Sequence, residues 1–147
     1  MRILGSHFLP FSCEKTYRSL QDPAISVRCL PDFESLEQIG PDEYAVTIRL
    51  SVATLSGVFT GIIKVVDPHP PTSFRILVEG DLMFAFVKGE GLLQLKPSNE
   101  GTTLDYDGDI QVGGIIASLG QRVIDSTAKT MIRKFFDKLI EEVRKQP

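Results

Sequence analysis

The residues best suited to metal binding or nucleophilic catalysis are two histidines, His7 and His69, and two cysteines, Cys13 and Cys29. Neither histidine has another histidine or a carboxylate at the spacing that a zinc site needs. Cys29 has no neighbouring histidine to activate it, and the two cysteines are too far apart for a metal knuckle. We therefore expect no metal site and no catalytic nucleophile, and we expect free thiols, which are typical of the cytoplasm.

Three acidic residues, Asp105, Asp107 and Asp109, alternate along the chain and therefore share one face of a strand. Such carboxylates could be the first ligands of a calcium loop. The glycine position of that loop, however, holds Ile110, and its closing glutamate position holds Ile116, which excludes this type of site. We expect the three carboxylates to face solvent, where charge discourages aggregation of a sheet.

The glycines do not form a nucleotide-binding loop. The run Gly89-Glu90-Gly91 lacks the third glycine and the following helix of a dinucleotide site, and the sequence contains no G-x-x-x-x-G-K-[S/T] loop. Several glycines fall inside predicted strands instead: Gly57, Gly61, Gly80, Gly89 and Gly91. In a strand, such glycines let the sheet bend sharply or leave room above it.

Aromatic and aliphatic residues are plentiful. The chain has nine Phe and no Trp, and residues 62–66 and 82–87 are apolar on both faces of a strand. Inward-facing residues in excess of what close packing uses would line a cavity for an apolar ligand. A filled core is the alternative, and the sequence leaves both open.

The elements that position these residues are a mostly extended chain and a helical tail. Residues 2–9 predict a first strand, Ser12 caps a short helix over 13–20, and Asp22-Pro23 begins a second helix that Pro31 stops. From residue 33 apolar residues recur at every second position, which predicts strands. These strands cover 33–39, 43–51, 57–66, 74–80, 84–95 and 102–112, with a rigid connector at 67–71.

Residues 115–145 predict one long helix, with only Gly120 as an interruption. Its apolar residues point in two directions roughly 120° apart. The first direction comprises Ile116, Leu119, Val123, Ile124 and Thr127, and the second Met131, Ile132, Phe135, Phe136, Leu139, Ile140 and Val143. The helix therefore either wraps over a curved sheet or uses its far half to contact a partner.

This order of elements predicts an α+β helix-grip fold, in which a curved antiparallel sheet of about six or seven strands surrounds a long C-terminal helix. We expect residues 1–147 to form a single ligand-binding domain. The net charge of −3 argues against a nucleic-acid partner, and no apolar run approaches the ~20 residues of a membrane span. From residue 121 onward the tail has seven basic and four acidic residues, which could contact an anionic membrane or an acidic partner.

Two blocks of the sequence resemble the G-subunit family of carbon monoxide dehydrogenase. The first block comprises Asp22-Pro23, Arg28-Cys29-Leu30-Pro31 and Glu34-Ser35-Leu36-Glu37. The second comprises Val112-Gly113-Gly114, Ala117, Gly120, Arg122, Ile124-Asp125, Ala128 and Phe135-Phe136. The strand Gly57-Val58-Phe59-Thr60-Gly61 and the Lys88-Gly89 stretch are also similar, so the resemblance runs nearly end to end. The chain departs from the pattern at Asp32, where the family has glycine, and at Phe33, where cysteine is frequent.

The resemblance implies a START-like (SRPBCC), or Bet v 1-like, helix-grip domain and a non-catalytic accessory protein. It implies a molybdenum-containing carbon monoxide dehydrogenase, or a related hydroxylase, as partner. It further implies a respiratory quinone or another lipid as the bound molecule, with no other cofactor. The location that it implies is the cytoplasm, with peripheral contact to the inner face of the cell membrane.

We expect the hydrophobic ligand to lie between the curved sheet and residues 115–131. The predicted wall residues are Leu30, Phe59, Phe74, Ile76, Phe84, Phe86, Ile116, Leu119, Val123 and Met131. Burial of apolar ligand surface, at ~25 cal/mol per Å², would drive binding, and no reaction is required.

Two alternatives stay open. A scaffold module with a filled core would dock on an oxidoreductase, or on a second copy of the chain as a homodimer, through the far half of the tail. Its predicted docking residues are Phe135, Phe136, Leu139, Ile140 and Val143. An enzyme would need a carboxylate or histidine that points into the cavity, and Glu79 and Asp81 are the candidates.

Overall fold

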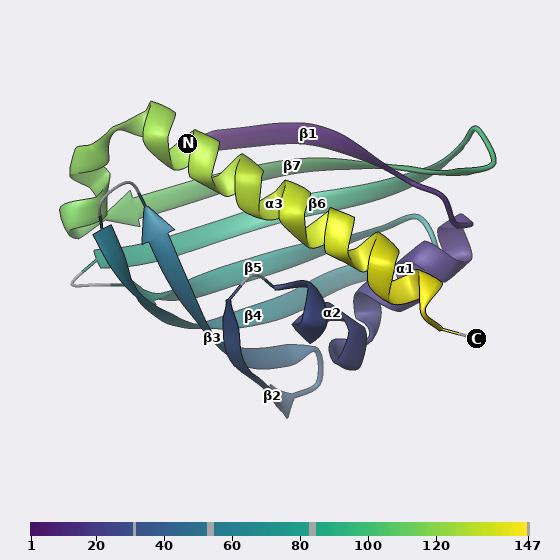
Figure 1. The fold of residues 1–147 in the computed structure, drawn as a ribbon, viewed down its shortest axis with the longest axis horizontal. Helices are drawn as coiled ribbons and strands as arrows, with labels where there is room; N and C mark the ends of the chain where they lie inside the picture. Colours follow the sequence, from purple (N-terminus) through teal and green to yellow (C-terminus); the bar gives the residue numbers. More distant parts are fainter. Residues whose placement is uncertain (31, 53–54, 83–84, 147) are drawn as a thin grey trace.

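The structure, a computed structural model, describes residues 1–30, 32–52, 55–82 and 85–146 (Figure 1). The strands are β1 (Arg2–Leu9), β2 (Phe33–Gly40), β3 (Glu43–Val52), β4 (Leu55–His69), β5 (Ser73–Leu82), β6 (Ala85–Ser98) and β7 (Gly101–Gly113). The helices are α1 (Cys13–Gln21), α2 (Pro23–Cys29), the 3-10 helix η1 (Gly114–Leu119) and α3 (Gln121–Arg144).

The seven strands form one antiparallel sheet in the order β1-β7-β6-β5-β4-β3-β2. Strands β2 to β7 pair in sequence order, and β1 pairs with β7, with Arg2 opposite Asp109 and Leu9 opposite Thr102. Figure 1 shows α3 lying across one face of the curved sheet, with α1 and α2 near its C-terminal end. This arrangement confirms the predicted α+β helix-grip fold.

The two short helices begin where their capping residues predict. The side chain of Ser12 accepts a hydrogen bond from the backbone N–H of Lys15 at 3.1 Å, which caps α1. The carboxylate of Asp22 accepts one from the N–H of Ala24 at 3.0 Å, and Pro23 occupies the first turn of α2. Each cap satisfies a backbone donor that the helix itself leaves unpaired.

The tail differs from the single helix predicted over 115–145. Gly120 adopts a φ of +91° between η1 and α3, a conformation that glycine reaches without strain, and it separates the two helices. Ile116 and Leu119 therefore belong to η1 and not to α3. The two apolar directions that the sequence predicts for one continuous helix thus belong in part to two separate helices. Neither α3 nor any other described helix is long and apolar enough to cross a membrane.

Strand β4 is longer than predicted. It continues through residues 67–69, which the proline-rich sequence predicts as a connector. The pairing with β5 is irregular between Val66 and His69, and Asp67 has a φ of +50° there. An irregularity of this kind lets a strand bend without losing its partner, which explains how Pro68 fits into β4.

Two apolar clusters lie between the sheet and the helices. The first lies where α1, α2 and the C-terminal half of α3 meet the sheet, and its members Leu9, Leu104 and Leu139 are fully buried. The second includes Phe59 of β4 and Ile116 of η1. Side chains of both clusters border a cavity between the sheet and the helices.

Candidate ligand-binding cavity

A cavity of about 410 Å³ lies between the inner face of the sheet and the helices. All seven strands contribute to its wall, including Ile63 of β4 and Val87 of β6, and α3 contributes Met131 and Phe135. This volume falls within the range of roughly 300–1,000 Å³ that is typical of small-molecule sites. The interior is therefore not filled by the chain's own side chains.

Inward-facing glycines leave space on the sheet, and only part of that space is occupied. Gly61 and Gly80 are opposite each other in β4 and β5, and a Cβ atom at either would lie 2.7 Å from the ring of Phe59. Gly91 and Gly108 are likewise opposite in β6 and β7, but a Cβ at Gly91 would approach other atoms no closer than 3.8 Å. The first gap is thus taken by an aromatic ring, whereas the space over Gly91 stays open, and both Gly91 and Gly108 form part of the cavity wall.

The polar part of the wall comes from uncharged side chains, including those of Tyr44 and Tyr106. Ser26 is satisfied, because its hydroxyl donates to the backbone carbonyl of Leu20 at 3.1 Å. The side-chain nitrogen of Gln21, Nε2, is buried and has no hydrogen-bond partner among the described residues. A buried donor without an acceptor costs ~1–3 kcal/mol, so Gln21 is an unsatisfied polar position in a largely apolar wall.

No lysine, arginine or histidine of the described chain lines the cavity. Glu90 and Asp107 border it, but their carboxylates lie on the outer face, where Glu90 is exposed and Asp107 pairs with Arg2 at 2.7 Å. This hydrogen-bonded pair lowers the pKa of Asp107. Asp105 and Asp109 lie on the same outer face, as the alternation predicts. The cavity wall described here therefore carries no cation, and the carboxylates near it face solvent.

The structure brings Leu30, Phe74, Ile76 and Met131 together at the cavity. Leu30 directly follows α2, Phe74 and Ile76 belong to β5, and Met131 belongs to α3. The structure thus shows these four predicted residues bordering the same cavity. Their contact with a ligand stays a prediction.

The other predicted wall residues lie elsewhere. Phe59, Ile116 and Leu119 pack in the second apolar cluster, beside the cavity. Val123 is half-buried on α3 and does not border the cavity. Phe84 lies outside the described residues. The tail therefore reaches the cavity further along α3 than predicted, at Met131 and beyond.

Phe86 is a correction to the predicted wall. Its side chain is 51% exposed and lies on the outer face, with its ring over Gly113, the residue opposite it on β7. Its neighbours Ala85, which is buried, and Val87, which borders the cavity, face inward. Because residues 82–87 are all apolar, their alternation does not define which face is buried.

The predicted docking surface is also corrected. All five of its residues pack in the first apolar cluster: Phe135, Phe136, Leu139, Ile140 and Val143. Phe136 stacks on His7 of β1, with ring centroids 5.3 Å apart, and Leu139 is fully buried. The far half of α3 therefore belongs to the core, because β1 and α2 cover it, and it offers no exposed apolar face to a partner.

The wall positions that were not predicted include Gln21, Tyr44 and Tyr106. The period-two pattern of residues 43–51 places Tyr44 on the same face as the buried Val46, and this signal would have been sufficient to include it. Tyr106 directly follows Asp105, which was predicted to face outward, so the alternation along the strand places Tyr106 on the inner face. Gln21 carries no such signal, because its position depends on how α1 and α2 pack against the sheet.

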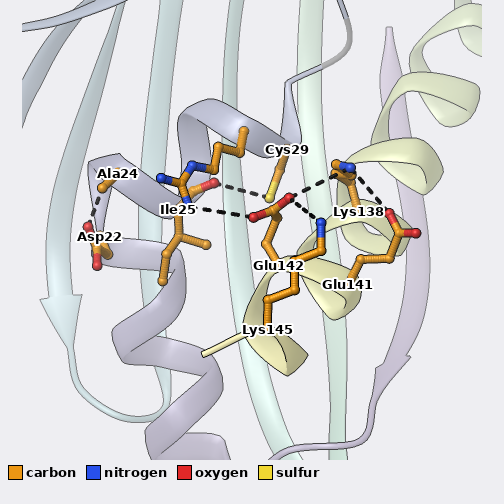
Figure 2. Close-up of polar contacts among 9 residues, drawn as sticks. Asp22, Ala24, Ile25, Cys29, Lys138, Glu141, Glu142 and Lys145 are labelled. Carbon is orange, nitrogen blue, oxygen red and sulfur yellow. Dashed lines mark hydrogen bonds and ion pairs between the residues drawn. The ribbon is translucent and has the colours of Figure 1, made fainter. Parts of the chain in front are cut away.

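An ionic cluster joins α2 to α3 beside the first apolar cluster (Figure 2). The carboxylate of Glu142, which is buried, lies 3.5 Å from Lys145, 3.6 Å from Lys138 and 3.7 Å from Arg28 of α2. Burial by itself would raise the pKa of Glu142, but the three cations together lower it. Cys29 lies beside this cluster, and burial raises the pKa of its thiol to about 11.

The lowered pKa of Glu142 predicts a pH-dependent contribution to stability. A carboxylate whose folded-state pKa lies below its unfolded value stabilises the fold above that unfolded value, and this contribution is lost as the pH falls through the folded-state pKa. We expect Glu142→Gln to lower the free energy of unfolding at neutral pH. The difference from wild type should shrink as the pH falls below 4.5, the ordinary pKa of the group.

Urea denaturation followed by circular dichroism at several pH values measures this difference. Glu141→Gln is the matched control, because Glu141 is exposed on the same helix and pairs with Lys138 at 3.4 Å. This control should change stability little at any pH, since exposed ion pairs contribute little. A constant deficit of Glu142→Gln across the pH range would contradict an ionic origin.

Solved structures of other proteins share this arrangement. A conserved protein from Geobacillus kaustophilus is 36% identical, with 99% of this chain and 96% of that chain covered and a TM-score of 0.93. A START superfamily protein from Mycobacterium smegmatis is 17% identical, with 97% of each chain covered and a TM-score of 0.73. Ara h 8.0201 is 14% identical, with 99% of each chain covered and a TM-score of 0.74. The last two likenesses show the fold alone, which is START-like and Bet v 1-like.

No curated protein matches the chain in sequence. The family model for the G subunit of carbon monoxide dehydrogenase (CoxG), in contrast, matches residues 7–144. This span includes both sequence blocks that carry the resemblance. It also takes in all or part of every element that borders the cavity, from the end of β1 to the end of α3. The chain belongs to the CoxG family of carbon monoxide dehydrogenase subunits.

Proposed function

We propose that this protein is a non-catalytic accessory protein that binds a hydrophobic small molecule, a quinone or another lipid, in its helix-grip cavity. The observation that carries the proposal is the open space over Gly91, which belongs to a largely apolar cavity of about 410 Å³. Burial of an apolar ligand there gains ~25 cal/mol per Å² of ligand surface removed from water. Binding in such a site needs no covalent step.

The placement of the candidate catalytic residues supports a binding role. Glu79 and Asp81 lie on exposed positions of β5, on the face of the sheet opposite the cavity. His7 of β1 is engaged by the ring of Phe136 and by the carboxylate of Asp137, which lies 3.5 Å away. A general acid or base has to reach the reacting atoms of a bound molecule. Glu79 and Asp81 face away from the cavity, and His7 packs behind Phe136 and is not among the described residues that border the cavity.

The proposed client is a molybdenum-containing carbon monoxide dehydrogenase or a related hydroxylase. The family to which the chain belongs is described as a subunit of carbon monoxide dehydrogenase, and this description supports the pairing. The proposed location is the cytoplasm, at the inner face of the cell membrane. Arg122, Arg133 and Lys134 are exposed on α3, and exposed basic residues on a helix are attracted to anionic lipids.

The proposed function predicts that Gly91→Leu abolishes ligand binding. A leucine side chain at this position would project into the cavity from the inner face of β6 and occupy the volume that the ligand needs. We expect wild-type protein to bind a short-chain menaquinone with a Kd below ~100 μM. Gly91→Leu should bind it at least about tenfold more weakly, a loss of about 1.4 kcal/mol. Isothermal titration calorimetry measures both affinities.

The control is Gln94→Leu, which adds the same side chain to the same strand on its exposed outer face. This variant should bind the menaquinone as wild type does. Thermal denaturation of both variants shows whether they are folded. Equal binding by Gly91→Leu and wild type would contradict the site, and no saturable binding by wild type below ~100 μM would contradict the proposed function.

A further inference from the structure

The two edges of the sheet differ in how well they are protected from pairing with another chain. β2 forms one edge; its pairing with β3 is irregular near both ends, and it carries two exposed carboxylates, Glu34 and Glu37. Irregular pairing and charge both discourage the addition of a further strand. β1 forms the other edge (Figure 1) and pairs with β7 in one unbroken register from Arg2 to Leu9. Between these two residues β1 has no proline, lysine, arginine or carboxylate, so this edge lacks such protection.

The register of β1 shows which of its backbone groups point away from the sheet. The terminal nitrogen of Met1 donates to the carbonyl of Ile110, and the N–H of Ile110 donates back to the carbonyl of Met1, both at 2.7 Å. Along an antiparallel ladder, such hydrogen-bonded pairs alternate with pairs that exchange no hydrogen bond. The odd-numbered residues of β1 therefore bond to β7. The even-numbered residues Leu4, Ser6 and Phe8 direct their N–H and C=O groups toward the free edge.

The same even-numbered residues make this edge complementary to a second copy of itself. Leu4 and Phe8 are 52% and 44% exposed on the outer face, and the ring of Phe8 is held in place over Gly101 of β7. When two copies of β1 run antiparallel with Ser6 opposite Ser6, each Leu4 lies opposite Phe8 of the other copy. The free backbone groups of both strands then meet as hydrogen-bonded pairs, and apolar cross-strand pairs add stability. No like charges oppose each other in this register.

We propose that β1 is a dimerisation edge, at which two copies of this chain pair antiparallel about a two-fold axis at Ser6 and join their sheets into one. Each copy offers the same surface, so the pairing closes after two copies and does not propagate. The axis runs perpendicular to the sheet, which places both cavities on the same side of the joined sheet. One strand per copy buries less than the ~800 Å² per partner of a standard complex, so the dimer forms at high protein concentration.

Sedimentation equilibrium between about 10 μM and 1 mM protein measures this association. Wild type should shift from the mass of one chain toward twice that mass. Ser6→Lys should weaken the association about fivefold, because two lysines then lie opposite each other at the axis. Within one copy the new lysine lies opposite Asp105, so the fold should be retained. An equal mixture of Ser6→Lys and Ser6→Glu should associate more tightly than either variant alone, since opposite charges then meet at the axis.

Ser35→Lys is the matched control, because it places a lysine on the exposed outer face of the other edge strand, β2. This variant should associate as wild type does. Hydrogen exchange gives a second readout: the amides of Leu4, Ser6 and Phe8 should become protected only as the protein concentration rises. Wild type that stays monomeric up to about 1 mM would overturn the inference. Association that Ser6→Lys leaves unchanged, or that the mixture does not restore, would overturn it as well.

Discussion

Leu139→Asp is expected to leave little folded protein at room temperature. The side chain of Leu139 is fully buried in the first apolar cluster, between α3 and the sheet. Truncation of a buried leucine alone costs about 2–5 kcal/mol, and an unpaired carboxylate in an apolar environment adds several more. The sum is comparable to the whole stability of about 5–15 kcal/mol that natural domains have. Far-UV circular dichroism and urea denaturation measure the loss.

The matched control is Ser126→Asp, which places the same carboxylate on the exposed side of the same helix. This variant should denature at nearly the wild-type urea concentration, because exposed positions tolerate such changes. A docking role for the far half of α3 makes a different prediction, namely that Leu139→Asp stays folded and loses only a partner. Recovery of a folded Leu139→Asp protein with wild-type stability would therefore contradict the core position of Leu139.

Alanine substitutions at two inward-facing glycines should have opposite effects on stability. At Gly61, the new Cβ would lie 2.5 Å from the backbone oxygen of Glu79 and 2.7 Å from the ring of Phe59, so the strands must shift. Overpacking of this kind typically costs about 1–3 kcal/mol. At Gly91, the nearest atoms would be 3.8 Å away, an ordinary contact distance. Alanine there should stabilise the protein by about 0.4–1 kcal/mol, because it reduces the conformational freedom of the unfolded chain.

The two variants control for each other, since both replace a glycine by alanine on the inner face of one sheet. Urea denaturation of the two proteins in parallel gives both free energies of unfolding. Equal destabilisation by Gly61→Ala and Gly91→Ala would mean that the gap over Gly91 is closed in solution. In that case the cavity, and with it the proposed ligand site, would lack physical support.

The fold was largely predictable because its signals are local. Ser12 and Asp22 can cap a helix wherever they occur, and the period-two pattern marks a half-buried strand such as β3 regardless of what packs against it. The break at Gly120 was harder to predict from the sequence. A single glycine in a helical pattern is compatible with continuation of the helix, and only the backbone conformation shows that the chain changes direction there.

The candidate site was only partly predictable because it depends on contacts between distant elements. The sequence shows that Gly61 and Gly91 lie in strands, but not that the ring of Phe59 reaches over Gly61 whereas the atoms around Gly91 leave room for a Cβ. Phe86 was misplaced for a related reason, since a strand that is apolar on both faces does not reveal its inner side. The sequence left the far half of α3 open between the sheet and a partner, because its cover, β1, lies more than a hundred positions earlier in the sequence.

The pairing of β1 with β7 has a consequence for synthesis on the ribosome. Arg2 of β1 lies opposite Asp109 of β7, so β1 has no neighbour in the sheet until the ribosome has translated β7, about a hundred residues later. Joining such distant segments closes a very large loop, and contacts of this range slow folding. Until β7 pairs with β1, the apolar residues of β1, including Leu9, remain exposed to solvent. Nascent chains of this topology therefore complete their sheet only late in synthesis. A chain truncated before β7 would have an incomplete sheet with exposed apolar residues, and it would be prone to aggregate.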